Sequence, residues 1–205
     1  MVPDWMGISP FYLEKAKELA DERYIVLVAD VYGKDVRPAN TEQAGLLAGK
    51  YKNDRPLLRN HIQAAYDYLL TVPGVDPARI VVMGYCFGGT TALELARNGH
   101  VLAGVVSFHG GLSNPTPENA KNIKAPLLIL HGADDPLVPP EEVRAFRAEI
   151  AAANVNMQFE SYLGAVHAFT NPAVGSDKST GVAYNEVAAK QSWQEFLRFL
   201  DRVLR

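Results

Sequence analysis

An apolar, β-branched run that ends at a cysteine between glycines constrains this chain more than any other stretch. The run occupies residues 80–83, and the motif that follows it is Gly84-Tyr85-Cys86-Phe87-Gly88-Gly89. Glycines two residues before and after the cysteine allow a strand to turn sharply into a helix, because a β-carbon at either place would collide across the turn. Such a nucleophile elbow holds its central side chain exposed above a sheet. The motif therefore predicts a reactive thiol at Cys86, where the usual elbow has serine.

Apolar runs typical of strands alternate along the chain with segments of helical periodicity. The predicted helices cover residues 11–22, 41–52, 56–70, 90–98, 140–152 and 185–204, and strands are predicted at 24–31, 80–83, 101–108, 125–130 and 157–162. This alternation indicates right-handed crossovers and a mostly parallel sheet with helices on both faces. We expect the run at 24–31 to be a parallel strand buried on both faces. The predicted fold class is α/β.

Length, charge and cysteine content limit the class of protein. With 205 residues, 48% of them hydrophobic, the chain can bury one sizeable core, and we expect a single domain over residues 1–205. The net charge of −3 gives no electrostatic reason to expect nucleic acid or an anionic membrane as partner. One cysteine excludes an intrachain disulfide, and no apolar span or basic leader is seen, which predicts a cytoplasmic protein.

Three residues follow predicted strands in the order of a nucleophile, an acid and a base. A thiolate attacks acyl carbon well, but it needs a neighbouring base to lower its pKa, and that base needs an acid to orient it. Cys86 lies at the elbow, and an aspartate and then His167 follow two later strands. The spacing from Gly132 favours Asp135 as the acid. Asp134 remains an alternative, because a tight turn can slip by one residue.

The other histidines are weaker candidates. His61 and His100 are expected to be structural or solvated, whereas His109 and His131 end predicted strands and could line the site. No two histidines lie at the spacing of metal ligands, so neither a metal nor another cofactor is predicted.

With these motifs in view, the chain resembles the dienelactone hydrolase family of α/β-hydrolases. The resemblance rests on the elbow, on residues 131–139 (HGADDPLVP) and on His167-Ala168-Phe169, and it extends through residues 3–7 (PDWMG), 30–33 (DVYG), 183–185 (AYN) and 192–193 (SW). It implies an α/β-hydrolase fold with Cys86 as nucleophile, His167 as general base and Asp135 as the residue that orients this base.

The resemblance also implies roles in binding and charge stabilisation. The backbone N–H groups of Phe87 and Trp5 are expected to form an oxyanion hole. Asp4 stands where the family has an acidic residue, usually glutamate, that helps govern the ionisation of the cysteine. The expected substrate pocket includes Asp4, Tyr85, Phe169 and Asn171.

Two departures from the family pattern concern the substrate and the sheet. Dienelactone hydrolases proper hold the substrate's carboxylate with arginines, but Asn171 stands at one of those places and residues 41–45 supply neither arginine nor tyrosine. The dienelactone itself is therefore not the expected substrate. Family members also have strands before the loop at residues 3–7, and we expect the sheet here to lack them, leaving an open edge.

These features predict a hydrolase of small carboxylic esters or lactones that works through an acyl-enzyme. Its expected partner is the small-molecule substrate, with no nucleic acid and no membrane, and the chain is expected to be a monomer or a homodimer. Three rival hypotheses are a peptidase or acyl transferase on the same scaffold, a catalytically impaired binding module, and a redox sensor that uses the single thiol.

Overall fold

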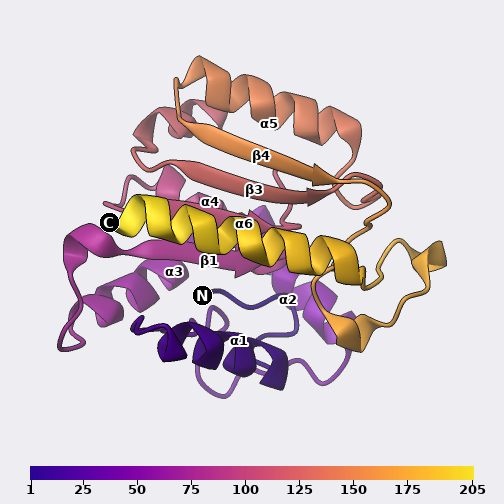
Figure 1. Ribbon diagram of the computed structural model, residues 1–205, viewed down its shortest axis with the longest axis horizontal. Coiled ribbons are helices and arrows are strands. Elements are labelled where there is room, and N and C mark those ends of the chain that lie inside the picture. Colours follow the sequence, from indigo (N-terminus) through magenta and orange to yellow (C-terminus); the bar gives the residue numbers. More distant parts are fainter.

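The computed structural model describes residues 1–205 and has a parallel four-stranded sheet at its centre, in the order β1-β2-β3-β4. The strands are β1 (Val81–Tyr85), β2 (Gly104–Phe108), β3 (Leu127–Gly132) and β4 (Met157–Tyr162). Neighbouring strands are also consecutive in sequence, and all three pairings are parallel. All four carboxyl ends therefore meet at one edge of the sheet (Figure 1). The predicted α/β class is confirmed.

Helices cover both faces of this sheet. α1 (Pro10–Asp21) and α6 (Glu186–Leu204) pack on one face, whereas α2 (Thr41–Asn53), α3 (Arg55–Leu70), α4 (Phe87–Arg97) and α5 (Pro140–Ala152) lie on the other side. Figure 1 shows α6 crossing the strands in front of the sheet, with α1 below it. Short 3₁₀ helices occupy residues 77–79, 117–122, 172–174 and 178–180. The predicted helices are all present, with bounds shifted by a few residues.

The two inner strands, β2 and β3, are mostly apolar because both of their faces are buried, whereas the edge strand β4 is only partly buried and carries polar residues. Successive side chains of a strand point to opposite faces. In β3, Leu127 and Ile129 belong to the core under α3, α4 and α5, whereas Leu128 and Leu130 belong to the core under α1 and α6. All four are at most 2% exposed. An inner strand such as β3 therefore needs apolar side chains on both of its faces.

The prediction of a buried strand at residues 24–31 is wrong. The segment is extended but does not form a strand, and residues 24–28 are half-exposed or exposed, with Ile25 50% exposed. Its contacts toward the sheet are made through Met1, which donates to the carbonyl of Leu27 at 2.8 Å and accepts from the N–H of Ala29 at 2.9 Å. A strand needs a continuous partner, and here the partner is one residue long.

Met1 pairs with that segment, and Val2, the next residue, pairs with β1. It pairs with Gly84 in parallel, donating to Met83 at 2.7 Å and accepting from Tyr85 at 3.1 Å. Beside this bridge, residues 24–27 together with Ile80, Val81 and Met83 line a cavity of about 460 Å³ with mostly apolar walls. The expected open edge of the sheet therefore lies beside β1.

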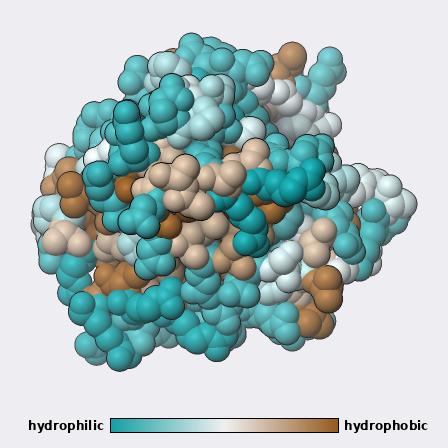
Figure 2. Space-filling view, turned by 90° about the horizontal axis from the view of Figure 1, so that it is seen from above, coloured by the Kyte–Doolittle hydropathy of each residue, from teal (hydrophilic) through white to brown (hydrophobic).

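The surface seen from above in Figure 2 is mostly hydrophilic, with hydrophobic residues scattered over it. Exposed apolar side chains elsewhere in the fold, such as Leu163 and Leu46, come from separate elements. Single apolar residues of this kind are usual on globular proteins. None of the helices combines the length and the apolar character needed to cross a bilayer.

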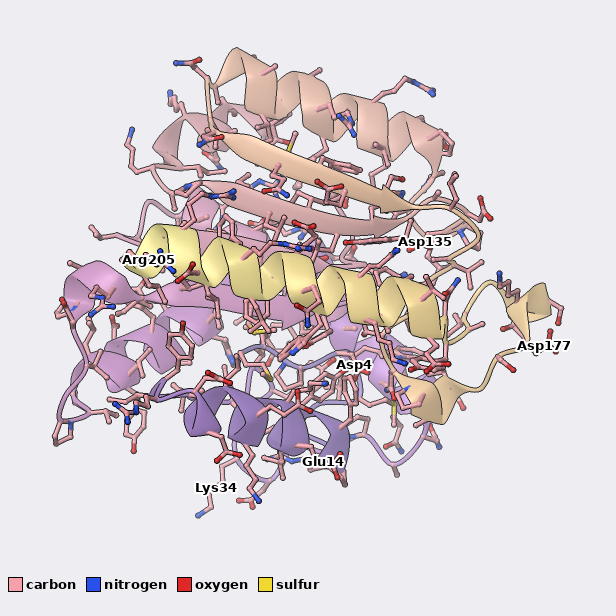
Figure 3. The ribbon with its side chains drawn as sticks, in the orientation of Figure 1. Asp4, Glu14, Lys34, Asp135, Asp177 and Arg205 are labelled. Atoms are coloured by element: carbon pink, nitrogen blue, oxygen red, sulfur yellow. The ribbon has the colours of Figure 1, made fainter.

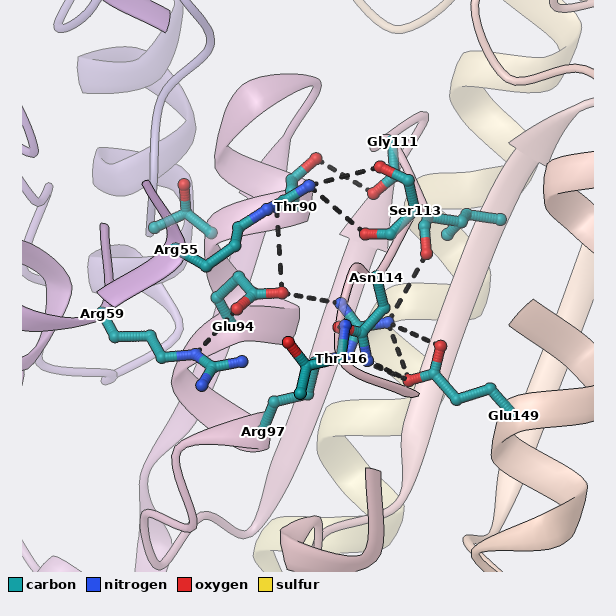
Figure 4. Close-up of polar contacts among 12 residues, drawn as sticks. Arg55, Arg59, Thr90, Glu94, Arg97, Gly111, Ser113, Asn114, Thr116 and Glu149 are labelled. Atoms are coloured by element: carbon teal, nitrogen blue, oxygen red, sulfur yellow. Dashed lines mark hydrogen bonds and ion pairs between the residues drawn. The ribbon is translucent and has the colours of Figure 1, made fainter. Parts of the chain in front are cut away.

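A buried ion-pair network joins α3, α4 and α5 (Figure 4). Glu94 contacts the guanidinium groups of Arg97 at 2.9 Å and Arg59 at 2.8 Å, and Arg97 in turn contacts Glu149 at 3.0 Å. The side chains of Glu94 and Arg97 are fully buried. A buried charge is tolerated when it is paired, and removing one partner leaves the other unpaired. The network therefore fixes α4 against its neighbours.

We predict that Glu94→Ala lowers the free energy of unfolding by about 3–5 kcal/mol, because the guanidinium of Arg97 would stay buried without its nearest carboxylate. Urea unfolding followed by circular dichroism measures this loss. Glu186→Ala is the control, since it removes a carboxylate whose ion pair with Lys190 is exposed on α6, and it should change stability little. Equal effects of the two substitutions would contradict the role given to the network.

Candidate active site

The turn from β1 into α4 has the geometry of a nucleophile elbow. Cys86 lies between the two elements with φ 55° and ψ −115°, a backbone conformation that costs energy for any residue with a side chain. A β-carbon on Gly84 would lie 2.0 Å from the carbonyl oxygen of Gly88, and one on Gly88 would lie 2.2 Å from that of Val2. Both glycines are therefore required by close backbone contacts. The N–H of Cys86 donates to Phe108 at 3.0 Å, which ties the elbow to β2.

The structure brings Cys86, His167 and Asp135 together in a line. Nδ1 of His167 donates to Oδ2 of Asp135 at 2.8 Å, and Nε2 of the same ring lies 3.0 Å from Sγ of Cys86. His167 is 6% exposed and Asp135 is 4% exposed. This spacing allows a proton to pass between the sulfur and the imidazole while the carboxylate fixes the tautomer of the ring.

Of the two candidate aspartates, only Asp135 contacts His167. Its other oxygen, Oδ1, accepts from the N–H of Leu137 at 2.8 Å, which holds the carboxylate in the turn after β3. Asp134 is exposed, and its N–H donates to Ala165 at 3.0 Å. The turn therefore directs one aspartate inward and its neighbour to solvent.

The loop that carries His167 is closed by backbone pairing. The N–H of His167 donates to Gly181 at 3.1 Å and its carbonyl accepts from Ala183 at 3.1 Å, forming an isolated parallel bridge with Val182. Residues 168–180 form an excursion beyond this bridge, and residues 172–180 are exposed. Figure 1 shows it extending from the body of the protein beside the start of α6. The histidine thus lies at the base of the excursion.

The charge of His167 is coupled to that of its neighbours. Burial alone would lower the pKa of His167, but the negative charge at Cys86 and the hydrogen bonds with Asp135 and Cys86 outweigh it and raise the pKa to about 10. The imidazolium of His167 is therefore stabilised at neutral pH, with its Nε2 3.0 Å from the sulfur of Cys86. A cation beside a cysteine favours the thiolate, which is the reactive form of a cysteine side chain.

Two backbone N–H groups near the elbow are not used inside the protein. Phe87 is the first residue of α4, and neither its N–H nor that of Trp5 donates to another group of the chain. The segment that leads to Trp5 touches the elbow, because a β-carbon on Gly88 would also lie 2.4 Å from the carbonyl of Pro3. Free donors beside a nucleophile, one of them at a helix N-terminus, can stabilise negative charge on a substrate oxygen.

Asp4 begins the turn that contains Trp5. Its Oδ1 accepts from the N–H of Met6 at 2.8 Å, and its carbonyl accepts from the N–H of Gly7 at 3.0 Å. Burial raises the pKa of Asp4, and hydrogen bonds from Tyr12 and Met6, together with positive charge at His167, offset part of that rise. In Figure 3, Asp4 and Asp135 both lie toward the amino-terminal end of α6.

The other residues expected in the pocket have different surroundings. Tyr85 is 1% exposed and points to the opposite face of the sheet, where it packs on Tyr12 and Phe108. Phe169 is fully buried, and Asn171 accepts from the N–H of Ala173 to cap a short 3₁₀ helix. The ring of Phe169 packs on that of His109, with 5.2 Å between their centroids.

A second buried histidine adjoins the site. His109 follows β2 with φ 41°, is 3% exposed, and packs edge-on to His167 with 5.3 Å between ring centroids. Its Nε2 lies 2.8 Å from Oγ1 of Thr170 in the loop after His167. Burial, and then the positive charge on His167, hold the pKa of His109 well below its usual value, so this ring is neutral. In the sequence, only the place of His109 at the end of a predicted strand indicated that it could line the site. Nothing in the sequence indicated Thr170.

No group of three or more histidine, cysteine, aspartate or glutamate side chains in the structure is arranged to hold a metal ion.

Known proteins resemble this chain in both sequence and structure. The model of the dienelactone hydrolase family matches residues 1–204. The crystal structure of a dienelactone hydrolase-like promiscuous phosphotriesterase from metagenomic libraries is 36% identical, with a TM-score of 0.94 over 100% of this chain and 85% of the other. A putative carboxymethylenebutenolidase of Saccharolobus solfataricus is 31% identical over 93% of this chain and 66% of its own length.

A probable 2-oxo-3-(5-oxofuran-2-ylidene)propanoate lactonase of Bradyrhizobium is 26% identical over 98% of this chain and 81% of its own length. With a family match over nearly every residue and a solved relative that superposes on all of them, the chain belongs to the dienelactone hydrolase family of α/β-hydrolases.

Proposed function

We propose that this hydrolase cleaves small carboxylic esters or lactones, with Cys86 as nucleophile, His167 as general acid and base, and Asp135 as the residue that orients His167. The observation that carries the proposal is the line of contacts from Asp135 through His167 to the sulfur, at 2.8 and 3.0 Å, at the end of β1. A thiol, an imidazole and a carboxylate in this order are the parts of a nucleophilic acyl-transfer site.

In the first half of the proposed reaction, the thiolate of Cys86 adds to the ester carbonyl and forms a C–S bond. The carbonyl oxygen becomes an oxyanion, to which the N–H groups of Phe87 and Trp5 would donate hydrogen bonds. When the tetrahedral intermediate collapses, the C–O bond breaks and the imidazolium of His167 gives its proton to the departing alkoxide. The products of this half are a thioester on Cys86 and an alcohol, which stays attached to the acyl group if the substrate is a lactone.

In the second half, water replaces the alcohol. The neutral imidazole of His167 takes a proton from water as the water oxygen attacks the thioester. The same N–H groups donate hydrogen bonds to the new oxyanion. Collapse of this intermediate breaks the C–S bond, releases a carboxylic acid and restores the thiolate beside imidazolium. Every proton moves through Nε2 of His167, the atom that faces the sulfur.

The proposed substrate class rests on the relatives and on one departure from them. Relatives named as a carboxymethylenebutenolidase and a lactonase support ring esters as substrates. Asn171, whose Oδ1 caps a turn, is neutral and so does not supply the positive charge with which an arginine holds a carboxylate on the substrate. We therefore favour neutral, small esters and lactones over the carboxylated dienelactone.

We predict that Cys86→Ala abolishes turnover of p-nitrophenyl acetate and of a simple lactone, because no other group is placed to form the acyl-enzyme. Release of p-nitrophenol and a pH-stat assay measure the two reactions. Circular dichroism serves as the control for the fold. Turnover that persists in the variant would sink the proposal, and a wild-type protein that shows rapid peroxide oxidation of Cys86 without any hydrolysis would favour the redox sensor.

The adjacent aspartates offer a matched pair. Asp135→Asn should lower kcat by about 10²- to 10⁴-fold, because an amide does not hold the required tautomer of His167. Asp134→Asn changes the same atoms one residue away on an exposed side chain and should leave kcat close to that of the wild type. Steady-state kinetics on one ester decide between them, and a larger loss from the substitution at Asp134 would reverse the assignment.

The raised pKa of His167 predicts how alkylation of Cys86 depends on pH. The pKa of His167 is raised to about 10, so the interactions of its protonated ring stabilise the fold fully below the usual histidine pKa of about 6.5, and this contribution is lost as the pH rises through about 10. Alkylation of Cys86 by iodoacetamide should therefore be fast and nearly constant from pH 7 to pH 9.

In His167→Ala the thiol loses its cationic partner, and alkylation at pH 7 should fall by about 10-fold or more and then rise toward the ordinary thiol pKa of about 8.5. Mass spectrometry of the single cysteine follows the rate. His100→Ala, which lies away from the site, is the control. A variant with the pH profile of the wild type would show that His167 does not set the ionisation of Cys86.

A further inference from the structure

Tyr32 contacts both backbone segments that carry the unused N–H groups. Its hydroxyl donates to the carbonyl of Trp5 at 2.8 Å, and its ring stacks on that of Phe87 with 5.6 Å between centroids and 29° between planes. The side chain is 5% exposed. Burial, and then negative charge at Asp4 and Cys86, raises the pKa of Tyr32, so the hydroxyl remains a donor at neutral pH.

The turn on which Tyr32 lies is itself fixed. Nδ1 of His61, on α3, donates to the carbonyl of Val31 at 2.7 Å, and the N–H of Gly33 donates to Oδ1 of Asp30 at 3.1 Å. Tyr32 is therefore held from both neighbouring residues, and its side chain is a rigid support for what it touches.

The group that Tyr32 binds is the central peptide of a tight turn. Asp4-Trp5-Met6-Gly7 is closed by the hydrogen bond from Gly7 to the carbonyl of Asp4 at 3.0 Å. The Trp5–Met6 peptide is planar, so its carbonyl and its N–H point in opposite directions. Tyr32 binds the carbonyl at 2.8 Å, and Oδ1 of Asp4 binds the N–H at 2.8 Å. Held at both ends, this peptide cannot rotate to the alternative turn.

We propose that Tyr32 is the positioning residue of the oxyanion hole. It would fix the Trp5 turn through its hydroxyl and the start of α4 through its ring, so that the N–H groups of Trp5 and Phe87 keep a constant separation. This inference rests on the proposed function, because it gives these two N–H groups the oxyanion as their ligand. Such donors act by being placed before the charge develops, so loss of the restraint lowers rate without removing a donor.

The test compares two tyrosines in one aromatic cluster. Tyr32→Phe keeps the ring on Phe87 and removes only the hydroxyl that binds Trp5. Tyr51→Phe is the matched control: Tyr51 is 3% exposed, packs on Tyr32 at 5.6 Å, and its hydroxyl lies 3.5 Å from Nδ1 of His61, away from the Trp5 turn. Equal melting temperatures of the two variants show that both have kept the fold.

We expect Tyr32→Phe to lower kcat for p-nitrophenyl acetate by about 10- to 100-fold with KM nearly unchanged, because a donor displaced by a fraction of an ångström is lost mainly to the transition state. Tyr51→Phe should retain the kcat of the wild type. Alkylation of Cys86 needs no oxyanion hole, so its rate should be the same in both variants. A Tyr32→Phe enzyme with wild-type kcat, or with a loss matched by Tyr51→Phe, would overturn the proposal.

Amide hydrogen exchange supplies a readout that does not depend on turnover. Exchange in the peptide that contains residues 3–7, followed by mass spectrometry, should be faster in Tyr32→Phe than in Tyr51→Phe and the wild type. Unchanged exchange there would also overturn the positioning role. Absence of ester and lactone hydrolysis in the wild type would instead count against the proposed function, so the two failures are distinguishable.

Discussion

The close backbone contacts at the elbow are the constraint on which the rest of the structure depends. Cys86 adopts φ 55° between two glycines that have no room for a β-carbon, and the carbonyls of Val2 and Pro3 lie against Gly88. The same few atoms therefore place the thiol, begin α4 and fix the segment that leads to Trp5. A change at Gly88 would move all three, because the thiol and the segments that carry both unused N–H groups meet at these contacts.

The fold and the three chemical residues were largely predictable because local patterns determine them. The glycine spacing predicted the elbow, and the order of residues after strands predicted Asp135 and His167. Residues 24–31 were mispredicted because their composition is that of a buried strand, whereas a strand also needs a neighbour to pair with, and Met1 and Val2 alone provide one. Tyr85 was expected in the pocket because it adjoins Cys86, but alternation along β1 turns it to the opposite face. Tyr32 and Thr170 act through contacts with residues far away in sequence, which no local pattern reveals.

Helix α4 connects the turn at Cys86 with the buried ion-pair network. Its first residue follows Cys86, and its last turns carry Glu94 and Arg97 of the ion-pair network. The network holds α4 against α3 and α5, and the elbow holds the same helix against β1. A helix fixed at both ends keeps its N-terminal N–H group at a constant place relative to the sulfur, which is the rigidity that a preorganised site requires.

The backbone bridge between His167 and Val182 separates this histidine from the excursion that follows it. Since Gly181 and Ala183 hold the histidine at the root of residues 168–180, the outer part of that excursion can change in length or sequence while the imidazole stays beside the sulfur. A loop of another length from a related hydrolase, grafted beyond this bridge, would therefore leave the backbone support of His167 in place.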